Sequence, residues 1–232
     1  NGKEYIVKTI VTTETIKTIA ERNGVEMYDV YTGFKWIANV MRENEGKKNY
    51  IGGGEESYGF LCEDFVRDKD AVSACVILAE IAAWAKDQGL SLYQLLQKIY
   101  VEYGFSKEKG ISVVKKGKSG AEEIEAMMKK FRENPLTEIA GSKVTYFYDY
   151  STLKGKDYAE NETVTLDMPT TSNVLQYFTE DNTKVSIRPS GTEPKIKFYC
   201  EVHSKVKSID ELPEAEKAAE EKINQIKASL GI

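Results

Sequence analysis

The segment RPSGTEPKIKFY (188–199) places anion-binding groups directly before a strand-like stretch. Gly191 can adopt a positive φ at low cost, which would let successive backbone N–H groups point into one concavity. Arg188 supplies a planar pair of donors that matches two phosphate oxygens, and Ser190 and Thr192 add hydroxyl donors. The segment therefore predicts a loop that binds an anion, with phosphate as the best fit.

One residue and one alternative weigh against this interpretation. The carboxylate of Glu193 does not suit an anion site, and we expect it to point away from the loop or to pair with Lys195 or Lys197. The same residues are also compatible with a tight hairpin turn that contains an incidental arginine. Composition alone does not separate the two interpretations.

The bulk composition is that of an ordinary globular protein. Its 232 residues, 41% apolar and 30% charged, are enough for one large or two medium domains. The net charge of −5 argues against nucleic acid as a principal partner. The apolar run from Ala71 to Ala85 contains Ser73 and Glu80 and is too short to span a membrane. We therefore expect a buried helix there and no membrane partner.

The cysteines and the N-terminus indicate the context of the chain. Cys62, Cys75 and Cys200 lie far apart and lack the spacing of a zinc site or a disulfide framework, which favours a reducing compartment and a cytoplasmic location. The chain begins at Asn1 without a methionine and enters a strand-like segment, 5–10, almost at once. We therefore expect a piece of a longer polypeptide.

Residues 1–106 are predicted to form an α/β domain, because strand-like apolar runs alternate with amphipathic helical segments. The expected strands are 5–10, 25–31 and 50–51. Two of the expected helices end near residues 22 and 45, and the other two cover 69–88 and 91–103. This alternation favours a largely parallel sheet with helices on both sides. The helix 69–88 is apolar almost all round, so we expect it to be buried on most faces.

Residues 107–232 are predicted to form an α+β domain, an antiparallel sheet packed by helices. The stretch 106–119, rich in Lys and Gly, is the candidate boundary, and we interpret it as a solvated linker with an edge strand. The expected strands are 111–114, 143–148, 163–166, 174–178, 185–188 and 195–202, and the expected helices are 120–132 and one with an apolar stripe from Leu212 to Leu230.

The segment GGGEESYG (52–59) is a second candidate site, with two carboxylates and a hydroxyl on a glycine-rich loop after a strand. Carboxylates accept hydrogen bonds from neighbouring sugar hydroxyls, and ligands of α/β domains bind at the carboxyl ends of parallel strands. A metal site is one alternative, although the spacing of the acids that follow matches no known ligand pattern. These acids are Glu63, Asp64, Asp68 and Asp70. A flexible acidic turn is the other alternative.

Both segments resemble parts of one enzyme family. RPSGTEPKIKFY is similar to the phosphate-binding loop in the last domain of the α-D-phosphohexomutases, the phosphoglucomutase/phosphomannomutase superfamily. GGGEESYG is similar to the sugar-specificity loop of that superfamily, which implies that Glu55 and Ser57 contact adjacent hydroxyls of a hexose. The implied phosphate-binding residues are Arg188, Ser190, Gly191 and Thr192.

The segment TGFKWI (32–37) resembles a third family element, which lines the same cleft. Gly33 and Lys35 match it and are implied substrate-binding residues. Phe34 stands where several branches have Trp or His, so a role specific to that side chain does not carry over.

The segment VRDKD (66–70) resembles a stretch that follows the sugar loop in the family, and it implies that Arg67 and Lys69 help to hold a phosphate. The four elements occur in the family's order across most of the chain. The resemblance is closest to the bacterial phosphoglucomutase and phosphopentomutase-like branch.

Two family elements do not occur in the 232 residues: the serine loop similar to TASHNP, which carries the phosphoryl group, and the loop similar to DGDGDR, which binds magnesium. The resemblance therefore covers the later part of the third domain, residues 1–106, and the whole fourth domain, residues 107–232. It assigns no catalytic residue and no metal ligand to this chain. We expect His203 to be an ordinary surface histidine.

The resemblance implies reversible transfer of phosphate between the 1- and 6-positions of a hexose through a bisphosphate intermediate. It also implies Mg²⁺ held outside this chain and an activator of the glucose 1,6-bisphosphate type. The implied partners are a phosphorylated sugar and the N-terminal domains of the same polypeptide, and we expect the chain alone to be inactive.

Two other functions are considered. One is a stand-alone, non-catalytic phosphosugar-binding module. The other is a nucleic-acid-binding sheet, which the acidic balance and the lack of paired aromatic residues on the last strand disfavour. The residues do not choose between glucose, mannose and pentose phosphates.

Overall fold

The structure is a computed structural model that describes residues 2–115, 117–191 and 193–232, without the side chain of Lys118. The chain divides into two compact units. Unit 1 comprises residues 1–104 with 206–209, and unit 2 comprises residues 105–205 with 210–232. The predicted order of an α/β part followed by an α+β part is confirmed.

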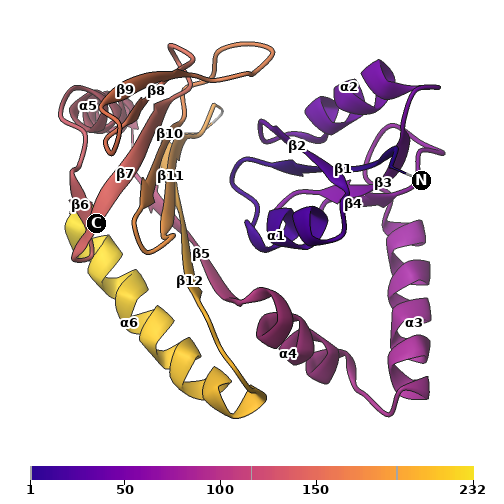
Figure 1. Cartoon of the computed structure of the whole chain (residues 1–232). Coiled ribbons are helices and arrows are strands. Elements are labelled where there is room, and N and C mark those ends of the chain that lie inside the picture. Colours follow the sequence, from indigo (N-terminus) through magenta and orange to yellow (C-terminus); the bar gives the residue numbers. More distant parts are fainter. Residues whose placement is uncertain (1, 116, 192) are drawn as a thin grey trace. The chain divides into compact units, whose positions relative to one another are not determined.

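Unit 1 is built on a mixed sheet with the strand order β2-β1-β3-β4 (Figure 1). Strands β1 (Glu4–Thr9), β2 (Glu26–Val30) and β3 (Asn49–Gly54) are parallel, as the alternation of strands and helices predicts. The antiparallel strand β4 (Phe60–Cys62) was not predicted, because its three residues are too short for a periodic signal.

Two helices cover opposite faces of this sheet (Figure 1). Helix α1 (Thr15–Arg22) connects β1 to β2, and helix α2 (Phe34–Asn44) connects β2 to β3. Because β1 lies between β2 and β3, the two right-handed crossovers run in opposite directions and place their helices on opposite faces. The core on the α2 side includes Ile37 and Met41, both almost fully buried.

Helix α3 (Ala71–Asp87) corrects the expectation of a helix buried on most faces. Only Ala85 is buried, while Val72 is 74% exposed and Trp84 is 55% exposed. Its all-round apolar composition predicts that other surfaces cover it, but within the described residues of unit 1 its principal neighbours are β4 and helix α4 (Leu92–Tyr103). Composition fixes the preference of a helix for burial, whereas its neighbours decide whether the burial occurs.

Unit 2 contains an antiparallel sheet with the strand order β5-β12-β11-β10-β7-β8-β9 (Figure 1). The strands are β5 (Phe105–Val114), β6 (Glu138–Ile139), β7 (Ser142–Asp149), β8 (Lys154–Asp157), β9 (Glu162–Thr165), β10 (Leu175–Thr179), β11 (Lys184–Pro189) and β12 (Lys195–Ser204). The predicted edge strand is present, but the start of the predicted linker 106–119 already belongs to this strand. Strand β5 begins at Phe105 and pairs with β12 along ten positions, so the ladder compensates for its weak strand composition.

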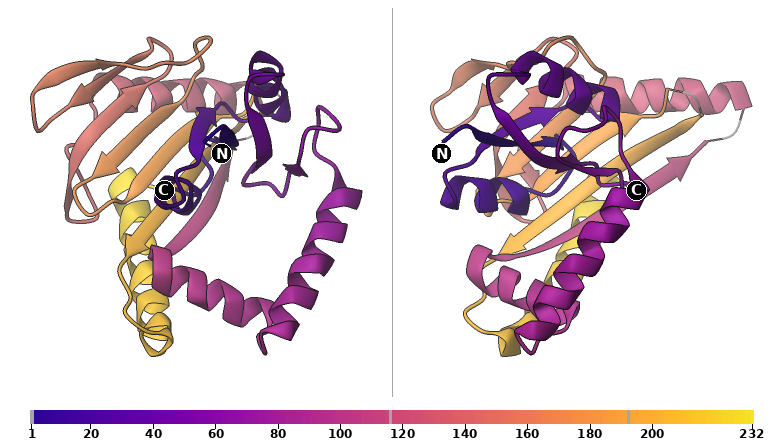
Figure 2. Two further views of the ribbon diagram at one scale, coloured as in Figure 1. Left: turned by 45° about the vertical axis from the view of Figure 1, so that its right-hand side comes forward. Right: turned by 90° about the vertical axis from the view of Figure 1, so that its right-hand side faces the viewer.

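Two helices pack on the apolar face of β12. Helix α5 (Gly117–Glu133) contacts β11 and β12, and the rings of Phe131 and Phe198 lie 6.2 Å apart. Helix α6 (Leu212–Leu230), preceded by a short turn η1 (Ile209–Glu211), runs along β12 and β5 (Figure 2). Its predicted apolar stripe is confirmed by the buried side chains of Ile223 and Ile226. None of the described helices has the length and hydropathy required to cross a membrane.

Candidate functional site

The two candidate segments of unit 1 meet at the carboxyl edge of its parallel strands. The loop after β2 contains Gly33, and the loop after β3 contains Glu55. The backbone N–H of Gly33 donates a hydrogen bond of 2.7 Å to Oε1 of Glu55. Gly33 has a φ of +120° and is the N-cap of α2, so the Glu55 carboxylate lies at the positive end of that helix. The resemblance grouped these two residues, and the fold brings them into contact.

Glycines allow the close approach that shapes this loop. A Cβ atom at Gly53 would lie 2.3 Å from the carbonyl oxygen of Val7, so no other residue fits between β3 and β1 without a shift of the strands. A Cβ atom at Gly59 would lie 2.9 Å from Oε2 of Glu55. The loop is closed by a hydrogen bond of 2.8 Å from the N–H of Glu55 to the carbonyl of Gly59. The glycine spacing therefore fixes the position of the Glu55 carboxylate.

The other residues of the sugar-loop segment differ in their surroundings. Oε2 of Glu56 accepts a hydrogen bond of 3.3 Å from the hydroxyl of Thr9, at the end of β1. Ser57 is exposed, and the side chain of Tyr58 is fully exposed. The hydroxyl of Ser57 is thus accessible to a ligand next to the anchored carboxylate of Glu55.

The two cations of the segment 66–70 that were predicted as site residues lie in different places. Lys69 lies beside the sugar loop, with Nζ 5.9 Å from the centre of the Phe34 ring and its Cδ near Gly59. Arg67 instead forms an ion pair of 3.0 Å with Glu45, just past the end of α2. Arg67 and Lys69, which were expected to help hold a phosphate, therefore lie at two separate positions.

Arg67 lines a cavity of about 410 Å³ along the outer side of α2. The lining residues are Lys35, Ala38, Asn39, Arg42, Glu45 and Arg67. Lys35 and Arg67 were predicted from the sequence as site residues, whereas Asn39 and Arg42 were not. A signal was present, because positions 35, 38, 39 and 42 share one face of a helix and carry two cations and an amide.

In unit 2, Arg188 lies near the end of β11, opposite Lys197 of β12. Within the described part of the chain, no ion pair engages the Arg188 guanidinium, which is half-buried. Ser190 is also half-buried, and Gly191 is exposed. The remaining predicted residue, Thr192, lies outside the described residues.

The backbone of this loop differs from the predicted concavity. The N–H of Ser190 donates to the carbonyl of Lys195 at 2.7 Å, and the N–H of Lys195 donates to the carbonyl of Glu193 at 2.7 Å. Gly191 does not occupy the left-handed region, so the expected positive φ is wrong. The hairpin ladder therefore uses the amide of Ser190, so this N–H does not point into an anion-binding concavity.

The carboxylate of Glu193 pairs with Lys195, with a distance of 2.7 Å between Oε2 and Nζ, as predicted. Its hydrogen bond to Lys195 lowers the pKa of Glu193 below its usual value. Because this pair is mutually neutral, Arg188 and Lys197 are the cations among the described residues of the loop region that no ion pair engages. Lys197 lies 5.9 Å from the centre of the Tyr199 ring.

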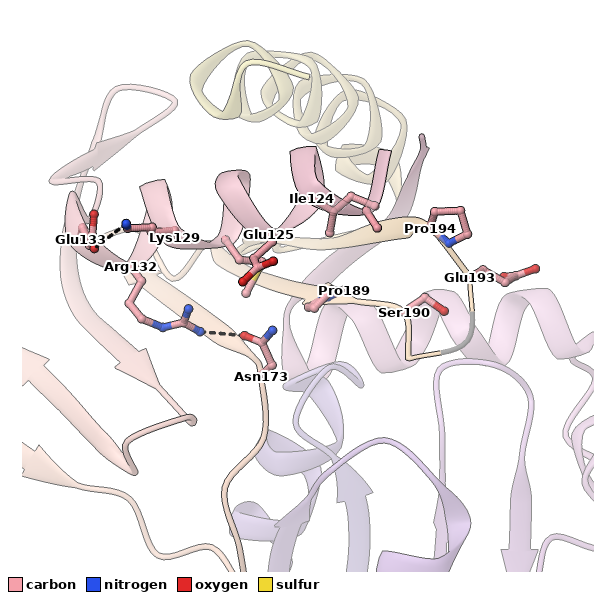
Figure 3. A pocket seen from close by; sticks show the side chains of 12 residues that line it. Ile124, Glu125, Lys129, Arg132, Glu133, Asn173, Pro189, Ser190, Glu193 and Pro194 are labelled. Carbon is pink, nitrogen blue, oxygen red and sulfur yellow. Dashed lines mark hydrogen bonds and ion pairs between the residues drawn. The ribbon is translucent and has the colours of Figure 1, made fainter. Parts of the chain in front are cut away.

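A cavity of about 580 Å³ adjoins the same loop (Figure 3). Pro189 and Ser190 line one side of it, and α5 lines the other. Arg132 of α5 donates to Oδ1 of Asn173 at 2.7 Å and to Oδ2 of Asp149 at 3.0 Å. The sequence does not predict this cavity, because its lining residues come from segments far apart in the chain.

A buried charged cluster lies elsewhere in the sheet of unit 2. The carboxylate of Glu201 binds Lys184 at 2.9 Å and Nε2 of His203 at 2.7 Å. Burial opposes the ionisation of Glu201, but the hydrogen bond to His203 and the charge of Lys184 outweigh it and lower the pKa of Glu201 to about 2. His203 is half-buried in this cluster, which corrects the expectation of an ordinary surface histidine.

Metal ligands do not gather among the described residues. No group of three or more His, Cys, Asp or Glu side chains there is placed to hold an ion, and this includes the acids 63–70. The three cysteines are free: Cys62 is half-buried, Cys75 is exposed and Cys200 is buried.

Two sequence profiles cover nearly the whole chain. The profile "Phosphoglucomutase/phosphomannomutase, alpha/beta/alpha domain III" matches residues 1–103, and "Phosphoglucomutase/phosphomannomutase, C-terminal domain" matches residues 112–219. The chain therefore belongs to the phosphoglucomutase/phosphomannomutase family, of which it contains domain III and C-terminal domain sequences.

Curated relatives agree with this assignment. The chain is 40% identical over 194 residues to a phosphoglucomutase of Staphylococcus aureus (strain bovine RF122 / ET3-1), which covers 84% of this chain and 35% of the relative. It is 36% identical over 198 residues to a phosphoglucomutase of Staphylococcus haemolyticus, covering 85% of this chain and 36% of the relative. The chain thus spans about a third of the length of the curated relatives it matches.

Solved structures share the fold. The open form of the Paramecium phosphoglucomutase pp63/parafusin matches with a TM-score of 0.58 at 19% identity, covering 88% of this chain and 33% of that chain. A phosphoglucomutase/phosphomannomutase family protein of Burkholderia thailandensis matches with a TM-score of 0.55 at 16% identity, covering 98% of this chain and 38% of that chain. At these identities the likeness concerns the fold alone.

Proposed function

We propose that this chain is the sugar- and phosphate-positioning part of a phosphohexomutase that interconverts hexose 1-phosphate and hexose 6-phosphate through a bisphosphate intermediate. The observation that carries the proposal is the hydrogen bond between Gly33 and Glu55. It joins two segments that the resemblance assigns to one sugar site, in the part of the chain that matches domain III.

In unit 1, Glu55 and Ser57 hold adjacent hydroxyls of the sugar. The carboxylate of Glu55 has a second oxygen, Oε2, that can accept a hydroxyl hydrogen while Oε1 stays bound to Gly33. Lys69 lies beside the loop and pairs with Asp68 at 3.1 Å, and its remaining ammonium donors can bind an anionic substrate. Gly33 and Lys35, at the start of α2, contribute to the same substrate site, and Gly33 also binds the Glu55 carboxylate.

In unit 2, Arg188, Ser190, Gly191 and Thr192 hold the phosphate that is not being transferred. Arg188 has the planar geometry that suits two phosphate oxygens, and the Glu193–Lys195 pair keeps the nearby carboxylate neutralised. Phosphoryl transfer depends on positioning the substrate and on neutralising its charge, so residues that bind the second phosphate contribute substantially to catalysis.

The remaining parts of the reaction lie outside this chain. Further domains of the same polypeptide would hold a phosphoserine as phosphoryl donor and Mg²⁺, which would supply charge neutralisation. No described group of side chains fits the metal, so we assign it no ligand and no step here. A glucose 1,6-bisphosphate-type activator and a cytoplasmic location belong to the same proposal.

Amide NMR of the isotope-labelled chain tests this function during titration with glucose 1-phosphate. We expect saturable shifts for residues 33–35, 54–59 and 188–195, and weaker shifts with unphosphorylated glucose. Absence of shifts at both 54–59 and 188–195 would overturn the proposal. Hexose phosphate turnover by the purified chain would refute its division of roles, since the chain alone is expected to be inactive.

A further inference from the structure

The cavity on the outer side of α2 is lined by three cations and a single carboxylate. Lys35, Arg42 and Arg67 contribute positive charge, and Glu45 contributes negative charge. The whole chain has a net charge of −5, so this local excess of positive charge runs against the composition. A cavity with an unbalanced positive lining attracts anions.

The cations are held by neighbouring groups that leave donors available. Nη2 of Arg42 donates to Oδ1 of Asn39 at 2.8 Å, and Nδ2 of Asn39 in turn donates to Oε1 of Glu43 at 2.7 Å. Arg67 uses Nη2 for Glu45. A guanidinium has five N–H donors, so each arginine keeps donors for a ligand after these bonds are made. Asn39 acts as a positioning residue for Arg42.

Helix geometry explains why these side chains converge. Lys35, Asn39 and Arg42 are separated by four and three residues, which places them on one face of α2. Arg67 reaches the same cavity from the segment after β4, and its ion pair with Glu45 ties that segment to the end of the helix. Two arginine forks and an ammonium group around one hollow match the geometry and the two charges of a phosphate monoester.

We propose that Lys35, Arg42 and Arg67 form a phosphate-binding site on unit 1, with Arg42 as its principal contact. This site is separate from the loop 188–192. Lys35 directly follows Gly33 and Phe34, so the site adjoins the residues that contact Glu55 and Lys69. The assignment of the phosphate to a phosphorylated sugar rests on the proposed function, whereas the anion site itself does not.

Amide NMR with inorganic phosphate tests the site, at an ionic strength held constant with sodium chloride. In the parent chain, the amides of residues 35–42 and 67 should shift saturably. Arg42→Gln should weaken that binding at least tenfold and leave the shifts at 188–195 unchanged. Lys17→Gln, which removes an exposed cation from α1, should behave like the parent.

The outcomes separate this inference from the proposed function. Phosphate shifts confined to 188–195, or equal phosphate affinity in the parent and Arg42→Gln, would overturn the inference and leave the proposed function standing. Shifts confined to α2 would support the inference and count against the phosphate loop. In a second titration with glucose 1-phosphate, the shifts at 54–59 should weaken in Arg42→Gln if the phosphate at α2 belongs to a sugar bound at Glu55, and unchanged shifts at 54–59 would overturn that assignment of the phosphate to the sugar.

Discussion

Removal of the Glu55 carboxylate should destabilise unit 1, because this group anchors the sugar loop to the start of α2. A hydrogen bond to a charged group contributes about 1.5–3 kcal/mol, and a carboxylate at a helix N-terminus adds about 0.3–1 kcal/mol. Glu55 is half-buried, so solvent reduces both contributions. We therefore expect Glu55→Ala to lower the free energy of unfolding by about 2 kcal/mol.

Glu55→Gln isolates the charge from the hydrogen bond. Its side-chain carbonyl can still accept the N–H of Gly33, so the loss should stay below about 1 kcal/mol. Urea unfolding followed by tryptophan fluorescence reports the unfolding of unit 1 in both variants, because the two tryptophans, Trp36 and Trp84, lie in unit 1. Glu21→Ala, which removes an exposed carboxylate from α1, is the matched control. The reasoning is refuted if Glu55→Ala matches this control, or if Glu55→Gln is as unstable as Glu55→Ala.

Three further predictions concern the fold. The pKa of Glu201 is lowered to about 2 from an ordinary 4.5, so the ionised carboxylate stabilises unit 2 above pH 4.5. About 3 kcal/mol of the free energy of unfolding should be lost as the pH falls toward 2. Circular dichroism should show a shallower acid dependence of stability in Glu201→Gln, and the same acid dependence as in the parent would contradict a stabilising role of the Glu201 cluster. Val76→Lys on exposed α3 should change the free energy of unfolding by less than about 0.5 kcal/mol. Leu61→Ala in the core should lower it by about 2–5 kcal/mol. Equal losses for the two variants in urea unfolding would show that α3 is covered. Gly53→Ala should destabilise unit 1 by about 1–3 kcal/mol because its Cβ meets the carbonyl of Val7, and a neutral effect in thermal unfolding would contradict that close contact.

The sequence predicts most of the fold because local periodicity reports it directly. The last strand, β12, and the stripe of α6 carry clear signals of period two and period 3.6. Strands β4 and β8 were missed, since β4 has only three residues and the residues of β8, KGKD, have weak strand preference. They form because neighbouring strands supply partners for their backbone groups, and that is a property of the tertiary fold.

The candidate site shows a similar division. The contact between Gly33 and Glu55 follows from the resemblance and from the rule that parallel strands end at one edge. Arg42 and Asn39 were missed because a cation and an amide on an exposed helix face resemble ordinary surface residues. Successive backbone N–H groups of the loop 188–192 were expected to face an anion-binding concavity, but the amide of Ser190 binds the carbonyl of Lys195 in the hairpin instead. Sequence letters do not reveal which competing hydrogen bond forms.

Calorimetric titration with glucose 1-phosphate and glucose 1,6-bisphosphate tests the central claim most directly, which is that Arg188 and its loop hold a sugar phosphate. We predict binding of the parent chain near a Kd of about 1 mM, or about −4 kcal/mol. The binding component that depends on the loop 188–192 should be lost in Arg188→Ala, which leaves the α2 site intact, and retained in Lys154→Ala, which removes an exposed cation from β8 of the same unit. Equal affinity of the parent and Arg188→Ala, or no binding by the parent, would contradict the claim.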